Sequence, residues 1–237
     1  VTLTGVNTIS STTTINAGTL TISGAGSTVS VTAITVNLGG TLTLDNSSTA
    51  VASRLLDSLV LTMNGGNFNF IGNGAGASSE TIGQLAIASG HSVVTVTPGA
   101  GGSTTLTFGA ATGFSRTAGA TVLFRGTSMR SAAAANVSTL LFTNAPALTG
   151  AAGAAGTTTM SVLKGAFGDT SLSGTGSDMV TIISTKLSPL AAGEYAGDLQ
   201  TANANVKLTA DRAAVATNTN SLILNGFAIT NPGGAIT

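Results

Sequence analysis

The chain offers few side chains of the kinds that carry out catalysis. Its 237 residues include eight acidic residues, eight basic residues, one histidine and no cysteine. A Ser-His-Asp triad needs a nucleophile and an acid around His91, and no GxSxG motif accompanies it. Zinc sites draw several ligands from His and Cys, which this composition does not supply. We therefore expect His91 to be a polar residue in a turn, and we predict no catalytic, metal-binding or cofactor-binding residue.

Five of the eight acidic residues are scattered over the less regular part of the chain. They are Asp169, Asp178, Glu194, Asp198 and Asp211. Enzymes that cleave polysaccharides rely on paired carboxylates, whereas no two of these acids fall at i and i+2 within an expected strand. Asp45 or Asp198 could bind calcium with backbone carbonyls, but neither an EF-hand nor a nonapeptide spacing is present. A solvated acidic surface is the expectation, and a carbohydrate-active β-helix is a minor alternative.

The basic residues favour no nucleic-acid partner. The net charge is zero and the charged fraction is 7%, so no basic stripe exists to neutralise phosphates. Arg116, Arg125 and Arg130 bracket an expected strand at 120–124, where they are either a small basic patch for an anionic glycan or scattered solubilising charge. No apolar run reaches the length of a membrane helix, so we expect no membrane insertion in this segment.

Threonines recur two residues apart and so share one face of a strand. The pairs are Thr19 and Thr21, Thr41 and Thr43, Thr95 and Thr97, and Thr105 and Thr107. Flat ranks of threonine occur in ice-binding solenoids, but Asn67 and Asn69 interrupt this rank, and threonine suits exposed strand positions in any case. Ice binding is therefore a minor alternative. The same face could also pack against a neighbouring fibre or carry O-linked glycans.

A repeated phrase, a glycine followed by a short alternating strand, organises the chain. Gly18, Gly40, Gly66, Gly90 and Gly119 lead such strands, at steps of 22, 26, 24 and 29 residues. A near-constant step of this length is typical of a solenoid. We predict an all-β fold, a right-handed parallel β-helix with irregular, loop-rich insertions. The main alternative is a β-sandwich, which would pair its strands antiparallel.

Alternation within these strands predicts which side chains face the core. The expected core ladder is Leu20, Ile22, Leu42, Leu44, Phe68, Phe70, Val94, Val96, Leu106, Phe108, Val122 and Phe124. We expect solenoid coils over 1–144 and a less regular β region over 145–237, which returns to the solenoid rhythm at 203–229; one continuous domain is the alternative. Residues 49–58 interrupt the rhythm and predict one or two helical turns, with Thr49 as the N-cap.

Two of the glycine-led segments carry a resemblance to a known family. Residues 17–24 (AGTLTISG) and 39–46 (GGTLTLDN) resemble the autotransporter-associated β-strand repeat, and 206–210 and 220–226 are similar to phrases between such repeats. The resemblance covers most of the chain, and it is loose at 126–200. It implies long bacterial proteins, secreted or exposed at the cell surface, with right-handed parallel β-helices and no defined catalytic residues. We expect the chain to be a mature or excised piece of such a protein.

The charge distribution predicts the behaviour of the two ends. Residues 1–53 contain one charged residue, Asp45, and 213–237 contain none. Open solenoid ends normally need charges or caps, and the sequence indicates no obvious cap beyond a weak one at 231–234. We predict that the ends either continue a longer solenoid or are assembly interfaces. The residues proposed for them are Val1, Leu3, Val6, Ile9, Leu222, Leu224, Phe227, Ile229 and Ile236.

Together these patterns favour a structural function. We expect a non-catalytic extracellular or cell-surface protein, a segment of a self-associating fibre or stalk that assembles by end-to-end β-stacking or strand exchange. Its expected partner is itself, as a homopolymer or as a continuation of a longer chain. The alternative is a bacterial adhesin whose irregular 126–200 region contacts a glycan or a cell surface.

Overall fold

The computed structural model describes residues 1–215 and 217–230, and this part of the chain is all-β. Seven strands form a first parallel stack: β1 (Thr2–Leu3), β3 (Gly18–Ile22), β5 (Gly40–Asp45), β7 (Asn67–Ile71), β10 (His91–Thr97), β13 (Thr121–Gly126) and β15 (Ala166–Asp169). Five form a second: β2 (Thr13–Ile15), β4 (Ala33–Asn37), β6 (Val60–Asn64), β9 (Gln84–Ser89) and β12 (Phe114–Arg116). A third contains β8 (Ser78–Ile82), β11 (Thr104–Phe108) and β14 (Ser138–Phe142).

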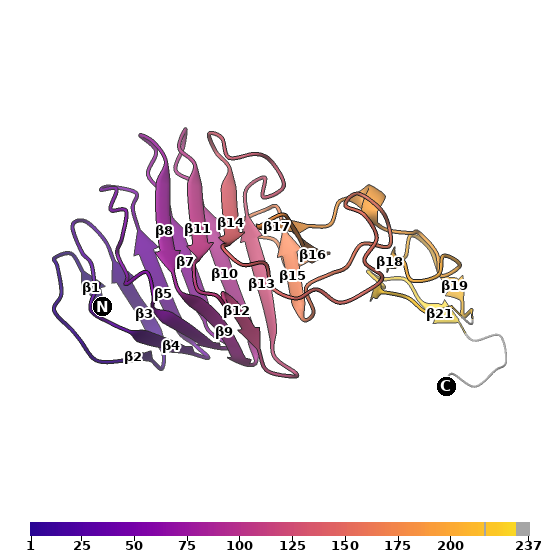
Figure 1. Cartoon of the computed structure of the whole chain (residues 1–237), viewed down its shortest axis with the longest axis horizontal. Helices are drawn as coiled ribbons and strands as arrows, with labels where there is room; N and C mark the ends of the chain where they lie inside the picture. Colours follow the sequence, from indigo (N-terminus) through magenta and orange to yellow (C-terminus); the bar gives the residue numbers. More distant parts are fainter. Residues whose placement is uncertain (216, 231–237) are drawn as a thin grey trace.

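The chain visits these stacks in turn. From β7 onward it passes through the first, third and second stacks and then returns to the first, and neighbouring strands lie side by side along the long axis (Figure 1). Strand pairs within the three stacks are parallel. The all-β prediction is therefore confirmed, and the pairing is not the antiparallel pairing of the β-sandwich alternative. No helix among the described residues has the length and apolar character needed to cross a membrane.

The repeated glycine phrase coincides with the first stack. The five strands that follow the phrase, β3, β5, β7, β10 and β13, are consecutive neighbours in one sheet. Two glycines before β5 illustrate why the phrase needs glycine. Gly39 has a φ of 83°, which L-residues rarely adopt, and a Cβ atom on Gly40 would lie 2.5 Å from the carbonyl oxygen of Ile15.

The interior is filled by the alternate residues of these strands. Eleven of the twelve residues of the expected core ladder are buried, and Leu20, near the open end of the first stack, is half-buried. Leu106 and Phe108 belong to the third stack rather than the first, and the Phe108 ring stacks on Phe142 with centroids 5.1 Å apart. The second stack adds buried residues such as Leu61 and Met63. One continuous apolar core therefore joins the three stacks, and it extends beyond residue 144 to Leu187.

The outward threonines form a shorter rank than the sequence suggested. The register pairs Thr19 with Thr41, and Thr21 with Thr43, after which Asn67 and Asn69 follow. Thr105 and Thr107 do not extend this rank, because β11 lies in the third stack. Thr95 occupies the same register row as Asn69 but is buried and accepts a hydrogen bond from Arg125. The rank is therefore too short and too mixed to support the ice-binding alternative.

An asparagine ladder, not anticipated from the sequence, runs along the carboxyl ends of the strands in the second stack. The Nδ2 atom of Asn64 donates to Oδ1 of Asn37 at 2.8 Å, and Nδ2 of Asn37 donates to Oδ1 of Asn16 at the same distance. The asparagine side chains bond from one coil to the next, in the same direction as the backbone hydrogen bonds between the strands. Each amide can donate to the coil before it and accept from the coil after it, so the ladder holds the strand ends in register.

The helical turns expected at 49–58 are absent. Instead this segment inserts the side chain of Arg54 into the interior, where the guanidinium donates to Oδ1 of Asn46 at 2.6 Å and to several backbone carbonyls of neighbouring loops. Glu80, also buried, accepts hydrogen bonds from the backbone N–H groups of Arg54 and Leu55, at 2.9 Å each. Satisfying two buried ionisable groups favours an extended loop rather than a helix, because the loop brings carbonyl acceptors to Arg54 and free N–H donors to Glu80.

Beyond the stacks the chain forms two smaller elements. β16 (Asp178–Ile183) and β17 (Lys186–Pro189) make an antiparallel hairpin. β18 (Asn205–Lys207) pairs in parallel with β20 (Ser221–Ile223), and β19 (Arg212–Ala213) pairs in parallel with β21 (Ile229–Thr230). The last four strands have their own small core around Val206 and Leu208. The return of the solenoid rhythm at 203–229 and the division at residue 144 stay predictions.

The buried Glu80 predicts an unusual pH dependence of stability. Burial raises the pKa of Glu80 to about 7, from an ordinary value near 4.5. The folded state then holds a proton that the unfolded state has already lost, so stability is highest below about pH 4.5 and falls by about 3 kcal/mol as the pH rises through 7. Chemical denaturation between pH 4 and 8 measures this fall. The variant Glu80→Gln should flatten the curve, whereas Asp211→Asn, at an exposed acid that does not contribute to the shift of Glu80, should leave its slope unchanged.

Candidate functional site

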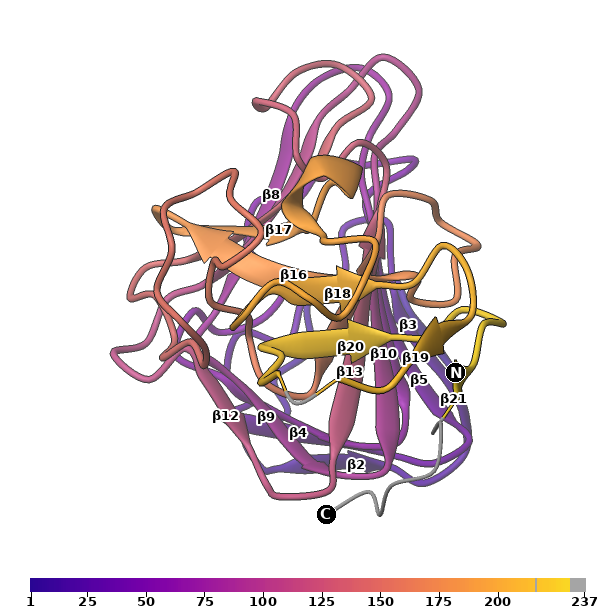
Figure 2. The ribbon, with the colours of Figure 1, turned by 90° about the vertical axis from the view of Figure 1, so that its right-hand side faces the viewer.

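The β16–β17 hairpin covers the end of the parallel stacks. β16 pairs antiparallel with β15 of the first stack, and β17 pairs antiparallel with β14 of the third, so the hairpin joins the two stacks into one sheet. Figure 2 shows β16 and β17 lying across this end, in front of the stacked strands. Antiparallel strands that lie across this end block further coils there, so the hairpin caps the stacks. The lack of an obvious cap at the two ends of the chain, 1–53 and 213–237, stays a prediction.

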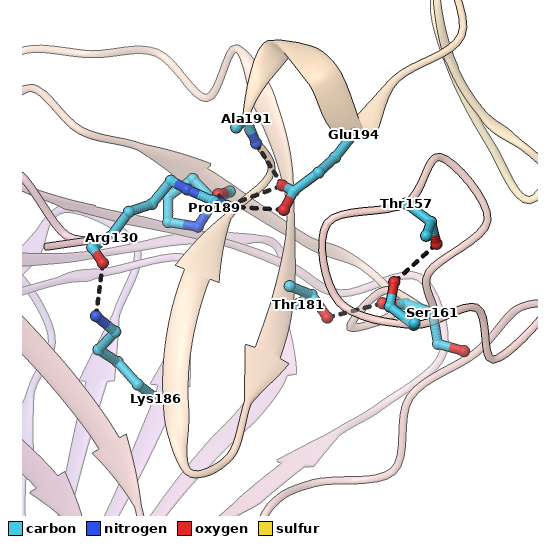
Figure 3. Close-up of polar contacts among 9 residues, drawn as sticks. Arg130, Thr157, Ser161, Thr181, Lys186, Pro189, Ala191 and Glu194 are labelled. Atoms are coloured by element: carbon cyan, nitrogen blue, oxygen red, sulfur yellow. Dashed lines mark hydrogen bonds and ion pairs between the residues drawn. The ribbon is translucent and has the colours of Figure 1, made fainter.

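A buried ion pair fastens the hairpin. The guanidinium of Arg130, in the loop after β13, binds both carboxylate oxygens of Glu194 at 2.8 and 2.9 Å and also donates to the carbonyl of Pro189. Glu194 lies in the single-turn 3₁₀ helix η1 (Ala192–Glu194) and also accepts from the N–H of Ala191 (Figure 3). Nζ of Lys186 donates to the carbonyl of Arg130 at 2.7 Å. The cluster connects the loop, the hairpin and η1.

For Glu194 these contacts correct the prediction of a solvated acidic surface, because Glu194 is 3% exposed. Asp169, Asp198 and Asp211 stay partly or fully exposed and accept hydrogen bonds from backbone N–H groups of their own turns or of the facing one. Asp169 and Asp178 also share one partner, the hydroxyl of Ser177. The acids therefore serve structural contacts.

A second cluster surrounds Tyr195, the single tyrosine of the chain. Its hydroxyl accepts a hydrogen bond from the N–H of Met179 at 2.7 Å, and burial raises its pKa. Nζ of Lys207 lies 5.5 Å from the ring centroid, within cation–π range, and 2.9 Å from Oδ1 of Asp178. The ring therefore links the hairpin to the small parallel element that follows it.

These two clusters line a concave site, which we name the Tyr195 groove. Its volume is about 760 Å³, within the range of ligand sites. The lining residues are Arg130, Thr170, Asp178, Pro189, Leu190, Ala191, Ala192, Tyr195, Gly197, Lys207, Leu208, Thr209, Asn225 and Phe227. Aromatic, apolar and hydrogen-bonding side chains are thus combined in one hollow beside the capped end of the stacks.

The other candidate residues lie elsewhere. His91 is the first residue of β10 rather than a turn residue, and its Nδ1 lies 2.8 Å from the hydroxyl of Thr121 on the next coil. Arg116 and Arg125 bond to different parts of the chain from Arg130, so the three arginines form no joint basic patch. No group of three or more potential metal ligands occurs in the residues that the structure describes.

Several of the predicted end residues are exposed. Val1 is 85% and Val6 72% exposed at the start of the first stack, and Ile9 is exposed as well, while Leu3 is half-buried. Leu222, Leu224 and Phe227 are exposed in the last parallel element, and Ile229 packs against its core. Ile236 lies outside the described residues, as does the weak cap suggested at 231–234.

Comparison with known proteins gives a partial relationship. No family model matches the chain, and no solved structure matches it. The chain is similar to the "Adhesin BmaC autotransporter" of Brucella suis biovar 1 (strain 1330), with 38% identity over 78 residues. That match covers 32% of this chain and 2% of the relative, so the chain spans a very small part of that protein's length. The match supports a relation to an autotransporter over part of the chain.

Sequence reasoning located the region of the Tyr195 groove but not its residues. The groove draws on 126–200, the irregular region proposed as a contact surface, and also on Lys207 and Phe227, which the sequence places among regular strands. The isolated tyrosine in a chain with few aromatic residues was the available signal. The sequence alone does not show which residues contact Tyr195, because the fold brings Met179 and Lys207 to it.

The Arg130–Glu194 pair should determine how firmly the hairpin is held. Replacing Arg130 with Met leaves the buried carboxylate of Glu194 without its cation, which we expect to cost about 3 kcal/mol. Hydrogen exchange of the β16 and β17 amides should accelerate, whereas the amides of β5 and β7 should not change. Arg212→Met, at an arginine that lacks such a pair in the described structure, is the matched control. Equal exchange in both variants would contradict this role for the pair.

Proposed function

We propose that the chain is a non-catalytic segment of an extracellular or surface-exposed bacterial adhesin, in which the stacked strands are a spacer and the Tyr195 groove is a contact surface. The observation that carries the proposal is the groove itself, a site of about 760 Å³ lined by Tyr195 and Phe227 beside the capped end of a long parallel core. The partial similarity to an autotransporter adhesin supports the surface location.

The spacer in this proposal is a right-handed parallel β-helix. The passage of the chain through the stacks in a fixed order supports it, since each return to the first stack is a parallel crossover. Such crossovers are right-handed in nearly all proteins. Continuous backbone pairing and an apolar stack make the spacer stiff and largely insensitive to salt, because few charges take part.

The non-catalytic part of the proposal is supported by how the ionisable groups are used. Glu194 and Asp178 pair with cations, and the other acids of the irregular region accept hydrogen bonds from backbone N–H groups. Glycoside hydrolysis needs two carboxyl groups facing one bond, one of which must be available as an acid. Groups committed to structural contacts do not meet that need.

Blocking the groove should abolish adhesion. Gly197 lines the groove, and a Cβ atom there would lie 3.4 Å from the side chain of Thr209, so Gly197→Trp should fill the hollow while the fold is kept. Beads coated with the chain would be tested for retention on cell monolayers. We expect retention to fall at least tenfold for Gly197→Trp. Gly193→Trp, on η1 outside the groove with open space around it, should behave like wild type; retention unaffected by either variant would contradict the proposal.

Self-association is a second candidate function, favoured by where exposed apolar side chains lie. Val1, Val6, Ile9 and Val29 are exposed at the start of the first coils, and Val215, Leu222, Leu224 and Phe227 are exposed in the last parallel element. Few other large apolar side chains are exposed among the described residues. An edge of this kind suits strand addition by a second copy, as in an end-to-end fibre.

Sedimentation velocity over a hundredfold range of concentration tests this second candidate. Self-association through the ends predicts oligomers that grow with concentration. Val6→Asp should then weaken association about tenfold or more, because it places a charge in an apolar contact. Leu38→Asp is the control, since Leu38 is equally exposed but lies between β4 and β5, on the side of the stack. A single monomeric species throughout would rule out assembly of this chain through its ends.

A further inference from the structure

The charges in the Tyr195 groove are already paired. Its charged lining residues are Arg130, Asp178 and Lys207. Arg130 is held by both oxygens of Glu194, and Lys207 lies 2.9 Å from Asp178. A charged ligand would have to compete with one of these pairs and desolvate a group that already has a partner. The groove is therefore better suited to an uncharged ligand.

An aromatic ring is exposed in the wall of the groove. Phe227 is 37% exposed, immediately after the turn at Asn225 and Gly226. The negative face of an aromatic ring attracts groups with partial positive charge, such as polarised C–H bonds. Tyr195, by comparison, has Lys207 near its ring and its hydroxyl bonded to the backbone. Phe227 is thus the ring that offers its surface to a ligand.

A donor and an acceptor lie side by side in the same groove. The side chains of Lys207 and Asp178 are 26% and 23% exposed, so the pair is partly open to solvent although its two charges are matched. Thr209 and Asn225 add neutral hydroxyl and amide groups to the lining. A hydroxyl both donates and accepts hydrogen bonds, so adjacent hydroxyls of one ligand can bind Asp178 and Lys207 together.

We propose that the Tyr195 groove binds a neutral oligosaccharide. The C–H face of a sugar ring packs on Phe227, and its hydroxyls bond to Asp178 and Lys207. This combination of an apolar face and a rim of hydroxyls in one uncharged ligand matches the lining, whereas an acidic glycan does not. The inference rests on the proposed function and specifies its ligand.

A glycan array with labelled chain tests the ligand class. The array would carry matched neutral oligosaccharides and their sialylated or uronic-acid counterparts. We expect binding to neutral members, followed by isothermal titration with the best of them. Binding confined to the acidic members would overturn the inference, and so would binding to none of them.

Two variants link such binding to the groove. Phe227→Ala should weaken binding of the neutral glycan about tenfold, while Leu224→Ala, which truncates a similarly exposed apolar residue outside the groove, should not. Asp178→Asn leaves Lys207 charged without its carboxylate, so this variant should gain affinity for acidic glycans relative to neutral ones. The assignment of the groove as the glycan site would be contradicted if Asp178→Asn kept the wild-type preference for neutral over acidic glycans. Equal losses of affinity in Phe227→Ala and Leu224→Ala would contradict it as well. Thermal unfolding of each variant checks that the fold is intact.

The two proposals fail in different ways. Retention of beads that depends on Gly197 but is not competed by neutral oligosaccharides would leave the adhesive function standing and exclude the glycan. In that case a protein ligand would occupy the groove. Loss of both retention and glycan binding would remove the adhesive function as well.

Discussion

Parallel backbone pairing in register is the constraint on which the rest of this protein depends. Each coil adds one strand to the first stack, so a side chain in one coil lies directly above its counterpart in the next. Register therefore decides burial: Leu42 lies between Leu20 and Phe68 in the core, while Thr41 and Asn67 share the outer face. A slip by one residue would exchange the two faces, which is why threonine alternates with leucine or isoleucine along β3 and β5.

Departures from this regularity are stabilised by polar side chains. Arg54 and Glu80 hold a loop where a helical turn might have formed, and the asparagine ladder holds the ends of the second stack. The Arg130–Glu194 pair fastens the hairpin that crosses the stacks. Charged residues are few, and Arg54, Arg130 and Glu194 lie where the repeat is interrupted. A buried polar group has to be satisfied by defined partners, so it specifies one arrangement of an otherwise permissive loop.

The Tyr195 groove lies at the capped end of the stacks. A uniform stack of parallel strands has flat sides and few concave sites. The hairpin and the short strands after it run in a different direction from the stacked strands, and the groove lies where they meet (Figures 1 and 2). Tyr195, Lys207 and Phe227 come together at this junction. The regular part of the chain thus suits a spacer, and the irregular part supplies a surface that can discriminate between ligands.

The sequence by itself determined the all-β class, the repeat and most of the core. The five glycines of the repeated phrase, from Gly18 to Gly119, mark consecutive strands of the first stack. Alternation within the strands identified eleven buried ladder residues. Both signals are local in the sequence, and they recur with every coil. Only the tertiary structure decided that Leu106 and Phe108 belong to another stack, that Arg54 and Glu194 are buried, and that Tyr195 meets Lys207. These contacts join residues that no short-range pattern connects, because they depend on where each irregular loop returns to the stack.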